Sequence, residues 1–189
     1  MTGRAFPWIR TPTQQGEGVR RPLTFASLEE KAAWLDAAAS LDARHPGVRA
    51  FAQRFQKGHA NDPGYVAREI HKFARDGISY CFGPSHQEFA DTWTIIAEGG
   101  AACDNCAGKS RVFVALCRAI EIDARIVPNF ASPDDFNHVQ AQVRWAGSER
   151  DPNAGPGGWL RVELIVRGVP LGAGPSAGQR TPSGGPMLT

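Results

Sequence analysis

The sequence predicts an α+β domain in which helices come first and a small antiparallel sheet follows. Three observations support this prediction. Apolar residues recur at helical spacing, between capping and breaking residues, through the first part of the chain. A long apolar helix then begins at Cys106 and reaches about Ile120. After it come three short β-like runs, separated by polar or Gly/Pro-rich segments.

Three helices are predicted before Cys106. Ser27-Leu-Glu-Glu30 is a capping box, and the Ala-rich run after it reaches about Asp42. A second helix starts after Pro46 and ends at Gly58. A third starts near Pro63 and stops at Gly77, with its apolar residues on one face, and 78–80 follows as a short extended segment.

The second half of the chain is predicted to form a buried helix and a sheet. The Cys106 helix is apolar almost all round, which indicates burial at the centre of the domain. The three β-like runs are 124–127, 138–145 and 159–164, with an exposed hairpin tip at 146–158. The middle run alternates between two faces, Val139, Ala141, Val143 and Trp145 against His138, Gln140, Gln142 and Arg144. This sheet is expected to pack on the Cys106 helix.

Composition describes an ordinary globular chain. Of its 189 residues, 42% are hydrophobic and 21% charged, enough for one domain and short for two. The net charge of +2 and the lack of a basic run with interleaved aromatics argue against nucleic acid as a partner. With no signal-like or membrane-spanning apolar stretch, we expect a cytoplasmic protein without a membrane partner, whose four cysteines are thiols.

The chain divides into three parts. Residues 1–24 carry scattered prolines without periodicity and are expected to form an extended arm. Residues 25–167 form the predicted domain. Residues 168–189 are rich in glycine and proline, show no core-forming pattern and are interpreted as a tail.

Cys106 stands where a polar, glycine-flanked loop turns into a helix. The free N–H groups and positive dipole end of a helix favour a thiolate, so a cysteine there is a candidate nucleophile. His138 opens the middle strand and Glu163 lies on the next one, and directly opposed residues on such strands have Cβ atoms about 4.5–5.5 Å apart. The order of these three residues along the chain predicts a catalytic triad. In it Cys106 is the nucleophile, His138 is the general acid/base and Glu163 orients the histidine.

Several motifs resemble the transglutaminase-like superfamily, especially the short forms encoded by tailed phages. Cys106-Ala-Gly-Lys109 and Leu116-Cys-Arg-Ala-Ile-Glu-Ile-Asp-Ala-Arg125 match its Cys-x-x-Lys start and its Leu-Arg-Ala-Leu-Gly-Ile-Pro-Ala-Arg end at the same spacing. His138-Val-Gln-Ala-Gln-Val143 and Gly158-Trp-Leu-Arg-Val-Glu163 are similar to its histidine and acidic strands.

The resemblance implies a papain-like fold and hydrolysis or transfer at an amide of a protein or peptide, with Cys106 rather than Cys103 as nucleophile. No cofactor or metal is expected. Hydrolysis is favoured over cross-linking because no segment resembles a calcium loop. The chain departs from the family pattern at four positions: Glu121 replaces glycine, Asp123 proline, Gln140 an aromatic and Glu163 aspartate.

Cys103-Asp-Asn-Cys106 allows other chemistry. As a Cys-x-x-Cys it suits a redox motif, although no thioredoxin-like strand precedes it. A zinc site would need further ligands, for which Cys81 with His71 or His86 are candidates. A disulfide between Cys103 and Cys106 would silence the nucleophile reversibly.

The alternative function is structural. The arms at 1–24 and 168–189 and the phage-like resemblance together suggest a non-catalytic subunit of a phage tail or neck, with a vestigial triad. On this interpretation the arms bind other virion subunits and the protein is assembled into a virion. Plain disorder of the arms is the competing interpretation.

Overall fold

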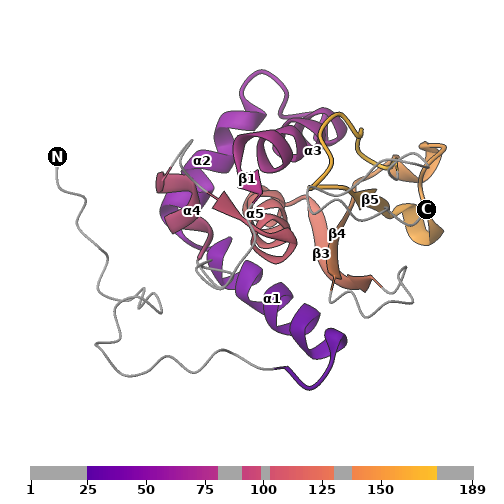
Figure 1. Ribbon diagram of the computed structural model, residues 1–189. Helices are drawn as coiled ribbons and strands as arrows, with labels where there is room; N and C mark the ends of the chain where they lie inside the picture. Colours follow the sequence, from indigo (N-terminus) through magenta and orange to yellow (C-terminus); the bar gives the residue numbers. More distant parts are fainter. Residues whose placement is uncertain (1–24, 81–90, 99–102, 130–137, 174–189) are drawn as a thin grey trace, which may run out of the picture.

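The computed structural model describes residues 25–80, 91–98, 103–129 and 138–173 (Figure 1). The predicted N-terminal arm, 1–24, lies outside these ranges, as do residues 174–189 of the predicted tail. The described residues form helices and a small antiparallel sheet, which confirms the α+β prediction.

The predicted helices are present. They are α1 (Leu28–Asp42), α2 (Pro46–Gln56), α3 (Pro63–Lys72) and α5 (Cys106–Ala119). A further short helix, α4 (Thr92–Glu98), precedes α5 and was not predicted. Ser27 caps α1 by accepting the Glu30 N–H, and the Glu30 carboxylate reaches back to the N–H of Ala26. The third helix differs from its prediction at the end, where it continues past Lys72 as a π-helical turn, η2 (Phe73–Gly77).

Two sheets are present among the described residues. The first pairs β1 (Ser79–Tyr80) with β2 (Cys103–Asp104) in parallel. The second is antiparallel in the order β3-β4-β5, formed by β3 (Asp123–Asn129), β4 (His138–Arg144) and β5 (Leu160–Val162). The second sheet matches the three predicted runs. The two-residue β2 has no periodicity to reveal it, because its existence depends on a partner more than twenty residues away.

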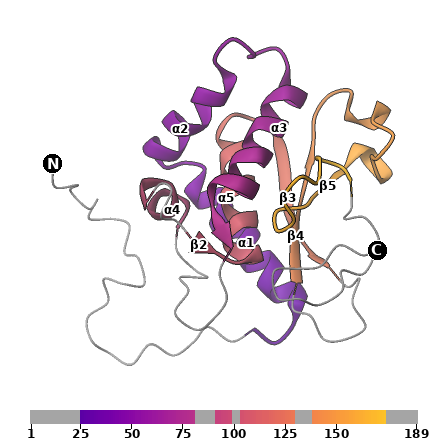
Figure 2. The same ribbon diagram turned by 45° about the horizontal axis from the view of Figure 1, so that its top comes forward.

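Helix α5 is the centre of the domain. It packs against α1, α2 and α3 and against β3 and β4 of the sheet (Figures 1 and 2). Residues 107–117 of α5 are all buried, as the all-round apolar pattern predicts. The buried faces of the strands, with Ala124, Ile126, Val139, Ala141, Val143, Leu160 and Val162, complete this core.

Packing continues beyond β5 into part of the predicted tail. Val169 and Leu171 are buried, and the Arg75 guanidinium of η2 donates a hydrogen bond to the Val169 carbonyl. The chain after β5 is therefore tied to the end of α3 and η2. The predicted boundary at 168 thus differs from the packing, which reaches at least Leu171.

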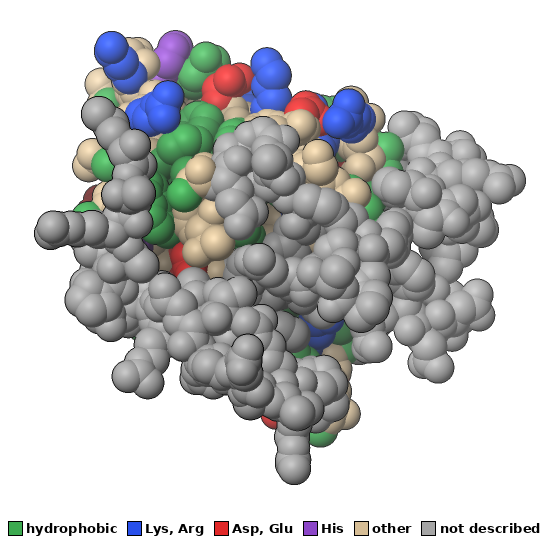
Figure 3. All heavy atoms as spheres, turned by 60° about the vertical axis from the view of Figure 1, so that its left-hand side comes forward, with side chains coloured by type: hydrophobic (Ala, Val, Ile, Leu, Met, Phe, Trp, Pro, Cys, Tyr) green, Lys and Arg blue, Asp and Glu red, His purple; other side chains and the backbone are tan. Residues whose placement is uncertain are grey.

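The segment 146–158 is more ordered than a simple hairpin tip. It contains two 3-10 turns, at Ser148–Arg150 and Pro156–Gly158. The buried Ser148 hydroxyl joins them, because it donates to the Gly158 carbonyl at 2.7 Å and accepts from Trp145 N–H at 3.2 Å. Basic and acidic side chains line the upper edge of the view in Figure 3.

Candidate active site around Cys106

The structure fixes Cys106 at the first position of α5. Asn105 caps the helix, and its side-chain oxygen accepts the N–H groups of Ala107 at 2.9 Å and Gly108 at 3.3 Å. Just before the cap, β2 pairs with β1, with Tyr80 opposite Asp104. The half-buried Cys106 carries a thiol, not a disulfide. Its backbone is thus held from both sides at the positive end of a buried helix.

The sheet carries the other two predicted residues. His138 is the first residue of β4 and lies opposite Asn129 of β3, while its side chain lies outside the described part of the chain. Glu163 follows β5 directly. The register pairs Ala141 with Val162, so one further step aligns Gln140, not His138, with Glu163. Extending this register places His138 two residues from the position opposite Glu163, a diagonal relation that spans about 7–8 Å in a sheet.

Glu163 is buried and bound by the chain around it. Its Oε1 accepts the N–H groups of Ile165 at 2.6 Å and Val166 at 3.1 Å, so the carboxylate closes a turn after β5. Its own carbonyl lies 2.6 Å from Nε2 of His71 on α3. Both ends of the residue are thereby fixed, which holds the carboxylate in one place.

Tyr80 connects Glu163 with Cys106. Burial raises the pKa of the Tyr80 hydroxyl, and the electrostatic effects of Cys106 and Glu163 act in the same direction. The energy of such an interaction falls as the distance between the charges grows. The structure therefore brings Cys106 and Glu163 into one neighbourhood around Tyr80, a residue that the sequence places only in the short extended segment 78–80.

His71 is a further residue for which the sequence gives no specific contact. Its ring is buried and stands edge-on to Phe113 of α5, with centroids 6.5 Å apart. Burial lowers the pKa of His71 to about 4, although the hydrogen bond to the Glu163 carbonyl acts in the opposite direction. His71 is thus neutral near pH 7, and Nε2 donates its hydrogen, because a carbonyl only accepts. The partner lies 92 residues away, so no local pattern could reveal it.

Arg118 and Asp36 have a structural role. The Arg118 guanidinium binds both carboxylate oxygens of Asp36, at 2.8 and 3.0 Å, and donates to the Ala124 carbonyl. The Asp36 carboxylate also accepts the Ile126 N–H at 2.8 Å. The motif arginine that identifies Cys106 by its spacing therefore joins α1, α5 and β3.

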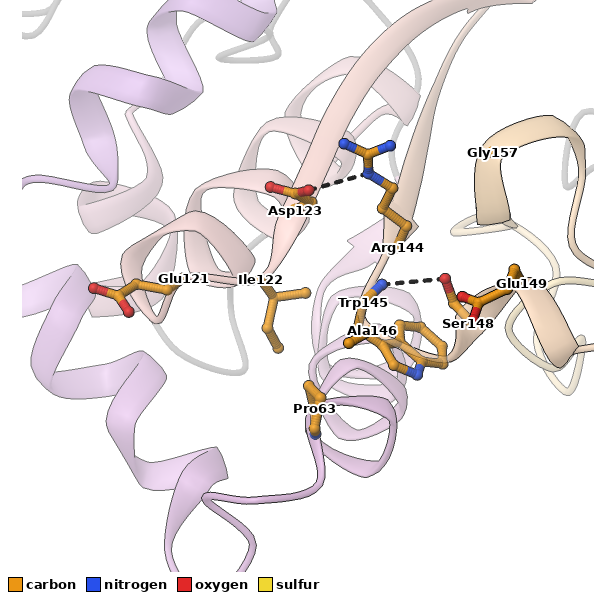
Figure 4. A pocket seen from close by; sticks show the side chains of 10 residues that line it. All are labelled: Pro63, Glu121, Ile122, Asp123, Arg144, Trp145, Ala146, Ser148, Glu149 and Gly157. Atoms are coloured by element: carbon orange, nitrogen blue, oxygen red, sulfur yellow. Dashed lines mark hydrogen bonds and ion pairs between the residues drawn. The ribbon is translucent and has the colours of Figure 1, made fainter.

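A hollow of about 530 Å³ lies at the opposite end of α5 (Figure 4). Its lining includes Glu121, Asp123, Arg144, Trp145 and Glu149, and an ion pair joins Asp123 to Arg144 across 3.0 Å. Because α5 rises about 1.5 Å per residue, its two ends are about 20 Å apart. This hollow therefore belongs to a different region from Cys106.

The residues that the structure describes give no support to a zinc site or to a redox role for the Cys-x-x-Cys motif. Within them no three histidine, cysteine or acidic side chains gather as metal ligands, and His71 is bonded to a carbonyl. Cys81 and His86 lie outside the described residues, and so does the side chain of Cys103. In the same ranges no helix is long and apolar enough to cross a bilayer.

An α+β domain with a cysteine at the start of its central helix, packed on an antiparallel sheet, defines the papain-like class of folds. The family model of the transglutaminase-like superfamily matches residues 49–164, so the chain belongs to this superfamily. The match contains α5 and the whole antiparallel sheet. The family resemblance predicted from the motifs is thereby confirmed.

Among solved structures, the chain is similar to a protein from Parabacteroides distasonis that is described as a candidate protease. The two share 14% sequence identity with a TM-score of 0.48, over 74% of this chain and 27% of the other. The chain thus spans about a quarter of that protein's length. None of the curated proteins compared with the sequence matches it significantly.

Proposed function

We propose that this protein is a cysteine hydrolase of amide or peptide bonds, with Cys106 as nucleophile, His138 as general acid/base and Glu163 as the residue that orients His138. The observation that supports this most strongly is the position of Cys106, at the start of a buried helix against which the strand opened by His138 packs. The burial of Glu163 and its electrostatic proximity to Cys106 through Tyr80 support it further. Membership of the superfamily agrees with this chemistry.

In the proposed reaction His138 takes the proton of the Cys106 thiol, and the sulfur attacks the carbonyl carbon of the amide. The Cys106 backbone N–H, at the positive end of α5, stabilises the oxyanion. The C–N bond then breaks, and His138 gives its proton to the leaving amine. Water, activated by the same histidine, hydrolyses the thioester and releases the acid and the thiol.

The first prediction is the pH dependence of Cys106 alkylation by iodoacetamide, measured site by site with mass spectrometry. An activated thiolate gives a profile with its midpoint below about 7.5, whereas an ordinary thiol has its midpoint near about 8.5. His138→Ala is expected to move the midpoint upward, because the thiolate loses its imidazolium partner. Cys117 is an internal control, since burial raises the pKa of its thiol and keeps it unreactive.

The Glu163→Gln substitution separates the proposed role of Glu163 in orienting His138 from its role in closing the turn after β5. Glutamine keeps a side-chain oxygen that can accept the Ile165 and Val166 N–H groups, but it removes the negative charge. We expect a smaller upward shift than for His138→Ala. A wild-type midpoint near that of a free thiol, unchanged in His138→Ala, would contradict the proposed nucleophile and favour a non-catalytic subunit.

A further inference from the structure

The outward face of the antiparallel sheet carries three arginines. The opposite face is buried, with α5 packed against β3 and β4, so the side chains that alternate with the buried ones point outward. Arg125 of β3, Gln142 of β4 and Arg161 of β5 lie opposite one another in the register, and both arginines are exposed. Arg144, the last residue of β4, is also exposed. Three guanidinium groups therefore share one surface of the sheet.

Trp159 holds two of these guanidinium groups in place. Its ring centroid lies 4.0 Å from Cζ of Arg125 and 4.6 Å from Cζ of Arg144, which are cation–π distances. Nε of Arg125 donates to Oε1 of Gln142 at 2.9 Å, and Nε of Arg144 donates to the Asp123 carboxylate at 3.0 Å. Within the part of the chain that the structure describes, the Nη groups of these two arginines make no hydrogen bond, so they remain as donors for a ligand.

The charge balance of this face favours an anionic ligand. Among the described residues of β3, β4 and β5, the exposed charged side chains are the three arginines and one carboxylate, that of Asp123. Glu121 and Glu149 line the neighbouring hollow together with Asp123 (Figure 4). Arg125 and Arg161 do not line that hollow. An anion is therefore expected beside Arg125 and Arg161, away from the acidic side chains.

The distance from this row to the proposed active site fits a peptide. Gln142, at the centre of the row, lies four residues after His138 on β4, which is about 14 Å along a strand. Arg161 lies two residues before Glu163. An extended peptide covers such a distance with about four residues. One short peptide is thus long enough to contact both the row and the proposed site.

We propose that the surface formed by Arg125, Trp159 and Arg161 binds an acidic peptide, and that acidic peptides are the substrate class of the proposed hydrolase. The substrate assignment rests on the proposed function, whereas the binding site does not. A guanidinium binds a carboxylate through two parallel N–H···O bonds, which suits the side chains of glutamate and aspartate. Stacking on Trp159 holds the Arg125 fork before the peptide arrives, which lowers the entropy that binding costs.

The test is peptide binding, measured by fluorescence anisotropy with the full chain. The probes are short amidated peptides of alternating glycine and glutamate that carry an uncharged dye. Peptides of alternating glycine and glutamine, or glycine and lysine, have the same length and differ in charge. Cys106→Ser serves as the binding protein, so that no probe is cleaved. We expect the glutamate peptide alone to bind, with an affinity that falls as the salt concentration rises above about 0.1 M.

Substitutions on this surface locate the site. Arg125→Gln and Arg161→Gln should each weaken binding about five- to tenfold, because each removes a charged donor group. Arg125→Lys keeps the charge without the planar fork, and its affinity should lie between those of the unsubstituted surface and Arg125→Gln. Arg54→Gln is the matched control, because Arg54 is exposed on α2 and its Cζ also lies over an aromatic ring, 5.2 Å from the centroid of Phe51. It should change the affinity less than about twofold.

Two results would overturn the inference. One is equal binding of the three peptides, and the other is an equal effect of Arg125→Gln and Arg54→Gln. A single-stranded oligonucleotide is the competing anion, since bases also stack on aromatic rings beside basic side chains. Tighter binding of the oligonucleotide than of the glutamate peptide would overturn the assignment to a peptide.

The failure of this inference and that of the proposed function give different results. Suppose that the glutamate peptide binds selectively while Cys106 alkylates as an ordinary thiol, with no effect of His138→Ala. The surface then stands as a site for an acidic partner, and the proposed function is contradicted. A low alkylation midpoint for Cys106 with no selectivity among the peptides contradicts only the acidic-peptide site.

Discussion

His71 shows how a single buried side chain links distant parts of the site. It is neutral, lies against Phe113 of α5 and donates its hydrogen to the carbonyl of Glu163. The Glu163 carboxylate in turn closes the turn at Ile165 and Val166. One histidine on α3 therefore fixes the backbone that carries the predicted orienting carboxylate.

The neutral state of His71 makes the fold sensitive to acid. Its pKa is about 4 in the folded protein and near the ordinary 6.5 when unfolded, so the unfolded chain binds more protons between these values. The free energy of unfolding contributed by His71 is complete above about pH 6.5. It is lost as the pH falls toward 4, by about 3 kcal/mol.

Urea unfolding at several pH values between 4 and 7.5 measures this loss. His71→Gln retains an N–H donor but does not titrate, so its stability should depend less on pH in this window. His59→Gln is the control, because His59 is exposed in the turn between α2 and α3. Equal pH dependence in the wild type and in His71→Gln would show that His71 does not produce the effect.

At the scale of elements, the end of α5 explains a departure from the family pattern. The Ile122 N–H bonds to the Cys117 carbonyl and the Glu121 N–H to that of Arg118, which is a Schellman motif. Its left-handed position is Glu121, with φ of 66°. The superfamily places glycine at this point, because glycine adopts this conformation without steric cost.

Glu121→Gly should therefore stabilise the protein, by about 1 kcal/mol in urea unfolding at neutral pH. Glu121→Ala is the matched control, because alanine removes the charge but keeps a Cβ in the left-handed conformation. If both variants change the stability equally, the charge of Glu121 rather than its backbone conformation is responsible.

At the scale of the whole molecule, a buried ion pair joins three helices. The Arg111 guanidinium of α5 binds both carboxylate oxygens of Asp42, at 2.7 and 2.9 Å, with side chains only 8% and 9% exposed. The same carboxylate accepts the N–H and hydroxyl of Thr92 at the start of α4. Asp42 thus joins α1, α4 and α5.

Arg111→Met should destabilise the protein by about 3–5 kcal/mol in urea unfolding, because it leaves the buried Asp42 carboxylate without its cation. Asp123→Ala is the control for an exposed pair. Asp123 and its partner Arg144 are 64% and 44% exposed, so the expected loss is at most about 1 kcal/mol. Similar losses in the two variants would show that burial does not determine the strength of these pairs.

Local patterns were sufficient to predict most elements. Capping residues and breakers located α1 to α3, and the alternation at 138–145 located β4. The π-helical turn after Lys72, the two-residue β2 and the packing of Val169 and Leu171 were not predicted. Each of these depends on contacts between segments far apart in the sequence, which no local periodicity records.

The sequence by itself determined the fold class, the family and the position of Cys106 at the start of a buried helix. Periodicity, capping residues and motif spacing are properties of neighbouring residues, so they can be read along the chain. Only the tertiary structure showed that Glu163 closes a turn held by His71, that Tyr80 lies near both Cys106 and Glu163, and that the Arg125 guanidinium stacks on Trp159. These contacts depend on strand register and helix packing, which form only when distant segments meet.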